Sequence, residues 1–238
     1  MAGNDTLKIV FYGTTEFSIP TLDRLLTDGA EISAVVTAPD KPAGRGQKLN
    51  ISPVKEFALK KNLRILQPAN LKDESFINEL QSIKPDLQIV VAFRMLPEIV
   101  WALPRLGTFN LHASLLPQYR GAAPINWAII NGEKETGVTT FFLRQQIDTG
   151  KIILQEKVDI SDSCTEGTMH NKLKEIGADL AIKTLHLIQT KQVVSIEQEK
   201  LIRQELKSAP KLNRQNTKLD IHKSPQEIYG CLTLYSAC

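Results

Sequence analysis

Strand-like and helix-like segments alternate along the first 190 residues of this chain, and this alternation restricts the fold more than any other feature. Residues 87–93 (LQIVVAF) form a nearly continuous apolar run of strand length, which is typical of the buried centre of a parallel sheet. Residues 7–12 and 32–37 are similar short runs, and helical patterns lie between them. The pattern predicts an α/β fold, with a mostly parallel sheet and helices on both of its faces.

Two positions indicate where helices begin. Ser18, followed by Pro20 and a stripe of leucines, is expected to cap a first helix, because serine favours the cap and proline the first turn. Ser163 and Glu166 have the spacing of a capping box and predict that the longest helix covers residues 163–187. Other helices are expected at residues 53–61, 72–83 and 124–130, and further strands at residues 108–112, 138–143 and 151–158.

In an open parallel sheet, ligands bind beyond the carboxyl ends of the strands. Three segments that follow expected strands are therefore the first candidates for a binding site: residues 13–17, 93–96 and 110–121. A fourth segment, residues 38–52, is long, polar and rich in proline, glycine and charge. Its composition suits a lid or a recognition loop, and it equally suits a mobile, solvent-exposed loop without such a role.

Several classes of function are disfavoured. The first strand is followed by GTTEF, with one glycine and a carboxylate where a dinucleotide-binding turn needs several glycines, so nicotinamide binding is disfavoured. The sequence has neither a Walker A pattern nor a cluster of His and Cys ligands, and we expect no metal. No apolar run approaches the roughly 18 residues of a membrane span, and the N-terminus has no secretory pattern. With only three widely spaced cysteines, a cytoplasmic protein without membrane contact is expected.

Positive charge gathers in the C-terminal part of the sequence. The whole chain has a net charge of +3, but residues 200–223 alone carry seven basic and two acidic side chains. A basic segment with few apolar residues fits two interpretations, a solvated linker and an arm that contacts a polyanion. The charge pattern leaves both of them open.

Asn110 and His112 are the strongest candidates for chemistry. They lie two residues apart at the end of an expected strand, so their side chains should point to the same side. An amide and an imidazole suit an oxygen that gains negative charge as a carbonyl becomes tetrahedral. Asp148 lies in a turn between two expected strands, and if the fold brings it to His112, its carboxylate would orient the imidazole. Each residue has a structural alternative: a turn cap for Asn110, core packing for His112 and ordinary turn chemistry for Asp148.

Together these pieces resemble the family of formyltransferases that use 10-formyltetrahydrofolate. The resemblance rests on Asn110, His112, the SLLP run at residues 114–117, the YRG run at 119–121 and Asp148. Three further patterns, GTTEF at 13–17, DKPAGRG at 40–46 and APKL at 209–212, are similar to the family members that formylate methionyl-tRNA. The resemblance implies the Rossmann-like formyltransferase fold of that family.

The resemblance also implies roles for individual residues. Asn110, His112 and Asp148 would be the catalytic residues. The folate donor would be held by Ser114, Leu115, Leu116 and Pro117 and by the strand end Phe93, Arg94, Met95 and Leu96. The initiator methionyl-tRNA would be contacted by Lys41, Arg45, Lys48, Arg120 and Lys211. The implied reaction moves the formyl group of 10-formyltetrahydrofolate to the α-amine of the methionyl-tRNA, for translation initiation and without a metal.

The family pattern predicts three parts: a catalytic domain at residues 1–190, a basic linker at 191–212 and the start of a C-terminal tRNA-binding β domain at 213–238. The ending GCLTLYSAC departs from that pattern, so we interpret the chain as C-terminally truncated, and we expect a monomer. Two alternatives remain: a related formyltransferase acting on a sugar-nucleotide or ribonucleotide amine, and an inactive truncated module that binds folate or RNA. The PAGRG loop and the basic linker argue against the first alternative.

Overall fold

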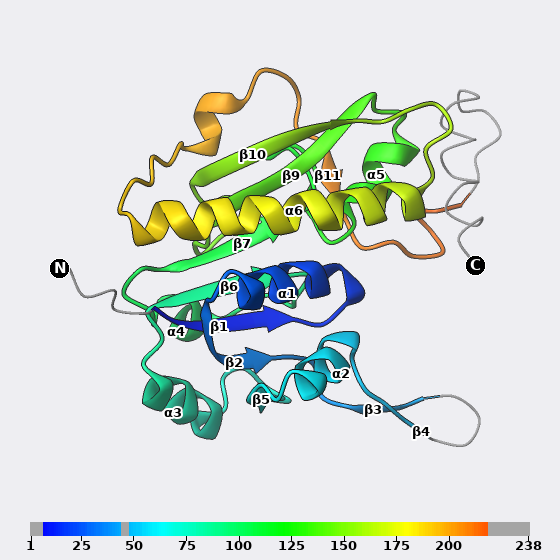
Figure 1. The fold of residues 1–238 in the computed structure, drawn as a ribbon. Coiled ribbons are helices and arrows are strands. Elements are labelled where there is room, and N and C mark those ends of the chain that lie inside the picture. The colour runs from blue at the N-terminus through cyan, green and yellow to red at the C-terminus, as the bar shows by residue number, and fades with distance from the viewer. Residues whose placement is uncertain (1–6, 44–47, 219–238) are drawn as a thin grey trace.

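A computed structural model describes residues 7–43 and 48–218. Its centre is a seven-stranded sheet in the order β10–β9–β7–β6–β1–β2–β5 (Figure 1). The strands are β1 (Lys8–Gly13), β2 (Glu31–Val36), β5 (Ile65–Leu66), β6 (Leu87–Val91), β7 (Thr108–His112), β9 (Glu135–Phe142) and β10 (Ile152–Asp159). Five neighbouring strands of the sheet, β7, β6, β1, β2 and β5, pair in parallel. Strand β9 pairs antiparallel with β7, and β10 pairs antiparallel with β9 at the edge of the sheet. The predicted mostly parallel α/β sheet is confirmed.

Helices cover both faces of the sheet because its central strands are apolar on both sides. Alternate residues of β1 point to opposite faces, so that Ile9 and Phe11 join one core while Val10 and Tyr12 join the other. Two helices lie side by side over the first face, α1 (Ile19–Thr27) and α6 (Glu166–Gln189) (Figure 1). The second core receives side chains from α3 (Glu74–Ile83) and the short α4 (Glu98–Trp101). The other helices are α2 (Pro53–Lys60) and α5 (Pro124–Ile130).

Of the two predicted helix caps, Ser18 is confirmed in its position, whereas the predicted cap of the longest helix is wrong. Ser18 directly precedes α1, but its hydroxyl donates to the Val91 carbonyl at 2.7 Å and makes no capping hydrogen bond. It therefore ties the start of α1 to the end of β6. Helix α6 begins at Glu166, and its cap is Thr165, whose hydroxyl accepts the N–H of Thr168 at 3.2 Å.

The polar segment that was expected to be a loop contains a small hairpin, β3 (Lys41–Ala43) paired with β4 (Lys48–Asn50). The hairpin extends from the end of the sheet near α2 (Figure 1). Its base is fixed at Asp40, which contacts the Lys55 ammonium of α2 and accepts a hydrogen bond from Gln67 at 2.8 Å. These hydrogen bonds lower the pKa of Asp40, so the anchoring carboxylate stays ionised.

The chain turns back onto the domain after α6. Ile196 forms a bridge with Ile152, a short 3₁₀ turn follows at Gln198–Leu201, and β11 (Ser208–Ala209) pairs in parallel with β8 (Arg120–Gly121). We call residues 196–210 the strap. This packing differs from a solvated linker, one of the two interpretations of the basic segment. Within residues 7–43 and 48–218, no helix has both the length and the apolar character needed to cross a membrane.

Candidate active site

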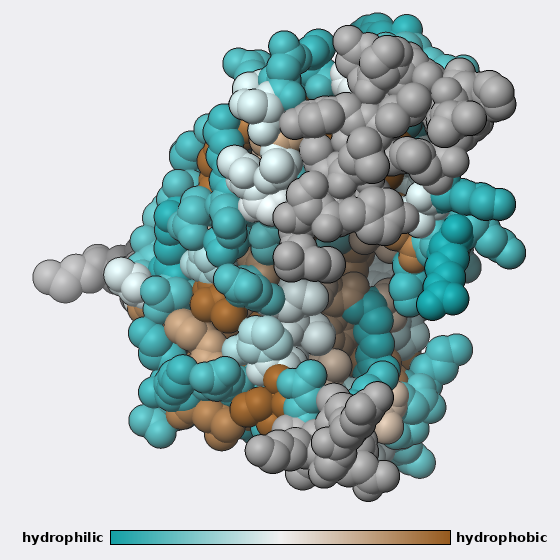
Figure 2. Space-filling model, turned by 90° about the vertical axis from the view of Figure 1, so that its right-hand side faces the viewer, coloured by the Kyte–Doolittle hydropathy of each residue, from teal (hydrophilic) through white to brown (hydrophobic). Residues whose placement is uncertain are grey.

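A cavity of about 610 Å³ opens beyond the carboxyl ends of β1, β6 and β7. All three strand-following segments singled out from the sequence contribute to its wall, through Thr15 and Phe17, residues 93–96, and residues 110–113. Figure 2 shows this side of the molecule, where hydrophobic residues line the hollow and hydrophilic residues surround it. The size and the largely apolar wall suit a small organic ligand.

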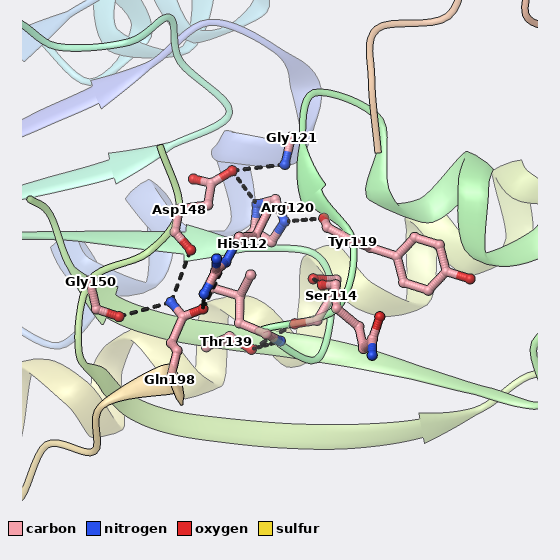
Figure 3. Close-up of polar contacts among 11 residues, drawn as sticks. His112, Ser114, Tyr119, Arg120, Gly121, Thr139, Asp148, Gly150 and Gln198 are labelled. Carbon is pink, nitrogen blue, oxygen red and sulfur yellow. Dashed lines mark hydrogen bonds and ion pairs between the residues drawn. The ribbon is translucent and has the colours of Figure 1, made fainter. Parts of the chain in front are cut away.

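Strand β7 brings Asn110 and His112 to the same cavity, as their spacing predicted. The imidazole is nearly buried, and its Nε2 lies 2.9 Å from the carbonyl oxygen of Tyr119. Because a carbonyl oxygen only accepts hydrogen bonds, we assign the ring proton to Nε2. The other ring nitrogen, Nδ1, is the one that faces Asp148 (Figure 3).

Asp148 reaches the site from the loop between β9 and β10. Its Oδ2 accepts the N–H of Gly121 at 2.9 Å and lies 3.9 Å from Nδ1 of His112 (Figure 3). The second distance is too long for a hydrogen bond but lies within ion-pair range. Since Asp148 also lines the cavity, the amide, the imidazole and the carboxylate converge on one place.

The main chain at Asp148 is unusual. Its φ is 50°, in the left-handed region that few non-glycine residues adopt and that Asp tolerates better than most. Neighbouring groups fix this turn: the Thr149 hydroxyl donates to the Gln146 carbonyl at 3.0 Å, and Arg144 Nε donates to that hydroxyl at 2.8 Å. The catalytic carboxylate expected from the sequence therefore sits on a turn that depends on its surroundings.

Tyr119 supplies the carbonyl that orients His112, and its own side chain is held in the fold. The phenol contacts Glu133 and accepts a hydrogen bond from Asn131 at 3.1 Å. Burial, with the neighbouring Glu133 carboxylate, raises the pKa of Tyr119, so the phenol remains neutral. The side chain acts as an anchor for the segment between β7 and β8.

The strand end 93–96, one of the two sets expected to hold a folate, lies on the cavity wall. The Phe93 ring meets the Tyr12 ring edge-on, with 5.6 Å between centroids. Arg94 is anchored by a hydrogen bond to the Ala69 carbonyl at 2.9 Å, whereas Met95 is 71% exposed. Apolar and polar groups are thus both presented at the end of β6.

The second expected set, Ser114, Leu115, Leu116 and Pro117, is placed differently. None of these residues is among the described residues that line the cavity. The Ser114 hydroxyl donates to the Gln118 carbonyl at 2.7 Å, and the Ser114 carbonyl accepts from Thr139 at 2.6 Å (Figure 3). Leu116 packs in a core cluster with β9 and β10. The described contacts of this run shape the turn that follows His112, and its role in folate binding stays a prediction.

The residues expected to contact tRNA fall into three groups. Lys41 and Lys211 are exposed, whereas Arg45 lies outside the described residues and only the backbone of Lys48 is described, in β4. Arg120 is half-buried, and its Nε and Nη2 donate to the Gln198 side-chain oxygen at 3.0 and 2.6 Å. Burial lowers the pKa of Arg120, opposed by the nearby Glu199 carboxylate. Arg120 is therefore engaged within the protein itself.

Sequence reasoning missed part of the cavity wall. The missed residues include Trp101, Asn126, Leu143, Arg144, Gln145, Glu166 and His170. Glu166 and His170 stand one turn apart at the start of α6, and the His170 ring meets Phe17 edge-on at 5.2 Å. Their spacing of four places them on one helix face, and the predicted helix at residues 163–187 already contained both of them. Among the described residues, no group of three or more His, Cys, Asp or Glu side chains is arranged to hold a metal ion.

Comparisons with known proteins place this geometry in a family. A family model described as formyl transferase matches residues 7–185. The methionyl-tRNA formyltransferase of Flavobacterium psychrophilum is 56% identical over 227 residues, which cover 95% of this chain and 71% of that protein. The enzyme of the same name from Bacteroides thetaiotaomicron is 52% identical over 226 residues, covering 94% of this chain and 70% of that protein.

Solved structures share the fold at much lower identity. WlaRD, a sugar 3N-formyl transferase studied with dTDP and 5-N-formyl-THF, has a TM-score of 0.71 and 22% identity, covering 97% of this chain and 79% of its own. Glycinamide ribonucleotide transformylase 1 from Symbiobacterium toebii has a TM-score of 0.68 and 17% identity, covering 82% of this chain and 96% of its own. At these identities the likeness concerns the fold alone.

Proposed function

This chain belongs to the formyl transferase family, and we propose that its cavity is where the formyl group of 10-formyltetrahydrofolate passes to the α-amine of methionyl-initiator tRNA. The high identity to methionyl-tRNA formyltransferases over almost the whole chain assigns it this reaction, which serves translation initiation. One observation carries the proposal for the site: Asn110, His112 and Asp148, from two separate segments, line a single cavity.

The folate donor is proposed to lie against residues 93–96. Backbone groups at the end of a strand can satisfy the alternating donors and acceptors of a pterin ring, and Phe93 and Leu96 offer apolar surface beside them. The cavity volume of about 610 Å³ is within the range of cofactor-sized sites, roughly 300–1,000 Å³. The formyl group would then face the end of β7.

The reaction exchanges one carbon–nitrogen bond for another. The neutral α-amine attacks the formyl carbon, and the carbonyl electrons move onto the formyl oxygen. The bond from that carbon to the folate N10 then breaks, and N10 keeps the electron pair and receives the proton that the amine loses. An α-amino group has an ordinary pKa of about 7.7–8.0, so the neutral nucleophile is readily available near neutral pH.

Asn110 and His112 are proposed to stabilise the negative formyl oxygen. The Nε2 of His112 is occupied by the Tyr119 carbonyl, whereas Nδ1 is 3.9 Å from Asp148 and therefore has no short hydrogen bond to that carboxylate. Nδ1 is thus available to donate to the oxyanion once the ring is protonated on both nitrogens, and Asp148 stabilises the positive charge of this imidazolium. The same carboxylate is placed to accept the amine proton, directly or through a water molecule, and to pass it toward N10.

Acceptor specificity tests the proposed function directly. The full chain is mixed with 10-formyltetrahydrofolate and, in separate reactions, with methionyl-initiator tRNA, a sugar-nucleotide amine, glycinamide ribonucleotide or no acceptor. We expect formyl transfer to the charged tRNA alone, with the N-blocked charged tRNA as the inert control. Transfer to either small amine would support the related formyltransferases instead, and folate binding without any transfer would support an inactive binding module.

The hairpin formed by β3 and β4 is proposed to contact the acceptor end of the tRNA. Arg45→Ala is expected to lower kcat/KM for the charged tRNA by about tenfold, the loss of one charge-assisted contact of roughly 1.5 kcal/mol. Binding of the folate donor, measured by equilibrium dialysis, should be unchanged, because the base of the hairpin is anchored separately at Asp40.

The matched control for this arginine is Arg64→Ala. Arg64 is half-exposed and pairs with Glu79 at 2.8 Å, away from the hairpin. Equal losses of tRNA activity and folate binding in Arg45→Ala would contradict the proposed division between hairpin and cavity. A steep fall of tRNA affinity with salt is expected for both the parent chain and the control variant.

A further inference from the structure

Both the nitrogen and the oxygen of the Gln198 side-chain amide, in the strap, form hydrogen bonds within the protein. Its side chain is fully buried, which is unusual for glutamine. The Nε2 group donates to the main-chain carbonyls of Asp148 and Gly150 at 2.9 and 2.8 Å, and Oε1 accepts two hydrogen bonds from Arg120 (Figure 3). One side chain therefore joins the turn that carries Asp148 to the strand that carries Arg120.

Those two segments carry the Asp148 carboxylate and the N–H group that donates to it. The Asp148 turn has its left-handed φ of 50°, a conformation that persists only where surrounding contacts fix it. The next residue after Arg120 is Gly121, whose N–H donates to the Asp148 carboxylate at 2.9 Å. Gln198 thus binds the main chain on the Asp148 side of this hydrogen bond and the Arg120 side chain on its Gly121 side.

The rest of the strap supports the same two segments. Tyr119, whose carbonyl orients His112, donates its N–H to the Lys207 carbonyl at 2.7 Å. Strand β11 lies so close to β8 that a Cβ added to Gly121 would be 2.4 Å from the Ala209 carbonyl oxygen. The strap therefore reaches the groups that hold both the imidazole and the carboxylate.

Ion pairs join the other flank of the strap to the Asp148 loop. Glu199 lies 2.9 Å from Arg144, and Glu197 lies 3.1 Å from Lys151. Each pair is partly exposed, so each contributes little alone. Gln198 stands between Glu197 and Glu199 and makes the buried contacts.

We propose that Gln198 is a positioning residue for formyl transfer: it holds Asp148 at its distance from His112 and so raises kcat without contributing to substrate affinity. This inference rests on the proposed function of the cavity. It assigns a catalytic purpose to a segment that the sequence presents as a basic linker, and it makes the strap part of the active-site architecture.

The test compares Gln198→Leu with the parent chain in the tRNA formylation assay. Leucine has a similar size but can make none of the four hydrogen bonds. We expect kcat to fall by about 10- to 100-fold, as for a small misplacement of a catalytic group, with KM for both substrates within about twofold. The matched control is Gln192→Leu, an exposed glutamine just before the strap, which should retain the parent kcat.

A double variant separates positioning from a general structural effect. In the Asp148→Asn background, Gln198→Leu should change kcat by no more than about twofold, because a residue that acts through the carboxylate has nothing left to position. Independent, multiplying losses in the double variant would overturn the proposal, as would a parent-like kcat or a loss confined to KM in Gln198→Leu.

A second substitution covers the case in which Gln198→Leu does not fold. Gln198→Glu keeps an acceptor for Arg120 but replaces the group that donates to the Asp148 and Gly150 carbonyls by a carboxylate oxygen, which those carbonyls repel, and a loss of kcat at least as large is expected. A parent-like kcat in this variant would overturn the proposal. Failure of the parent chain itself to formylate tRNA would instead reject the proposed function, so the two failures are distinguishable.

Discussion

Replacement of His112 by alanine is expected to lower kcat for formyl transfer by on the order of 10²–10³-fold, the usual cost of removing one donor to a developing oxyanion. The ring has Nε2 on the Tyr119 carbonyl and Nδ1 facing Asp148, and its removal would leave Asn110 as the remaining proposed donor. The KM for the folate donor should change little, because the interaction is made mainly in the transition state. Single-turnover formylation of charged tRNA measures the chemical step directly.

The control for this substitution is His186→Ala. His186 is half-exposed on the far part of α6, where it pairs with Asp28 at 2.7 Å, and its loss should leave turnover unchanged. Because His112 is buried, thermal unfolding of the variant should be recorded together with its activity. A folded His112→Ala protein with turnover within about threefold of the parent would exclude the imidazole from catalysis.

The parts of the fold that were predictable are those whose pattern is local. Strand β6 is buried along its whole length, so its apolar run marked it directly, and the limits of β7 were predicted to the residue. Strands of two residues, such as β5, β8 and β11, are too short to show a period and exist only because a partner strand lies beside them. The β3–β4 hairpin has the composition of a loop, and its two strands show no alternation of apolar and polar residues that would predict their pairing.

The candidate site also has residues that a local sequence pattern predicted and residues that no local pattern indicates. The period of a strand was enough to place Asn110 and His112 together, because two residues of one strand share a side. The approach of Asp148 was conditional on the fold, since a turn residue 36 positions later carries no local signal of its neighbour. Gln198 could not be found at all: it lies in a polar segment, and its burial arises only after the strap returns to the domain.

The run at residues 114–117 is a different case, because its expected role in donor binding stays a prediction. Its sequence stands out, and it was expected to line the donor site. The described contacts of Ser114 and Leu116 are with the turn and the core behind His112. The position of this run relative to the cavity follows only from the three-dimensional structure, because neither its composition nor its spacing indicates which way the turn after His112 faces.

Asp148→Asn is expected to lower kcat by on the order of 10²-fold, within the range for loss of a general acid–base group. The amide has nearly the same shape, its oxygen can still accept the Gly121 N–H, and Asn tolerates the left-handed φ of this turn. The substitution therefore removes the negative charge and the proton acceptor while it leaves the turn in place. The rate should be measured with saturating folate donor and tRNA, where only kcat is reported.

The negative charge of Asp148 is the property that Asp148→Asn removes. At 3.9 Å from His112 Nδ1, in a site where the two side chains are 7% and 12% exposed, the carboxylate is within ion-pair range of the ring and can balance its positive charge. Asp159→Asn, an exposed carboxylate at the end of β10, provides the matched control and should be silent. If Asp148→Asn turned over like the parent while His112→Ala did not, the aspartate would be a turn residue and the imidazole would act without it. If both losses occur and the double variant loses no more than His112→Ala alone, the two side chains act as one unit on the formyl group.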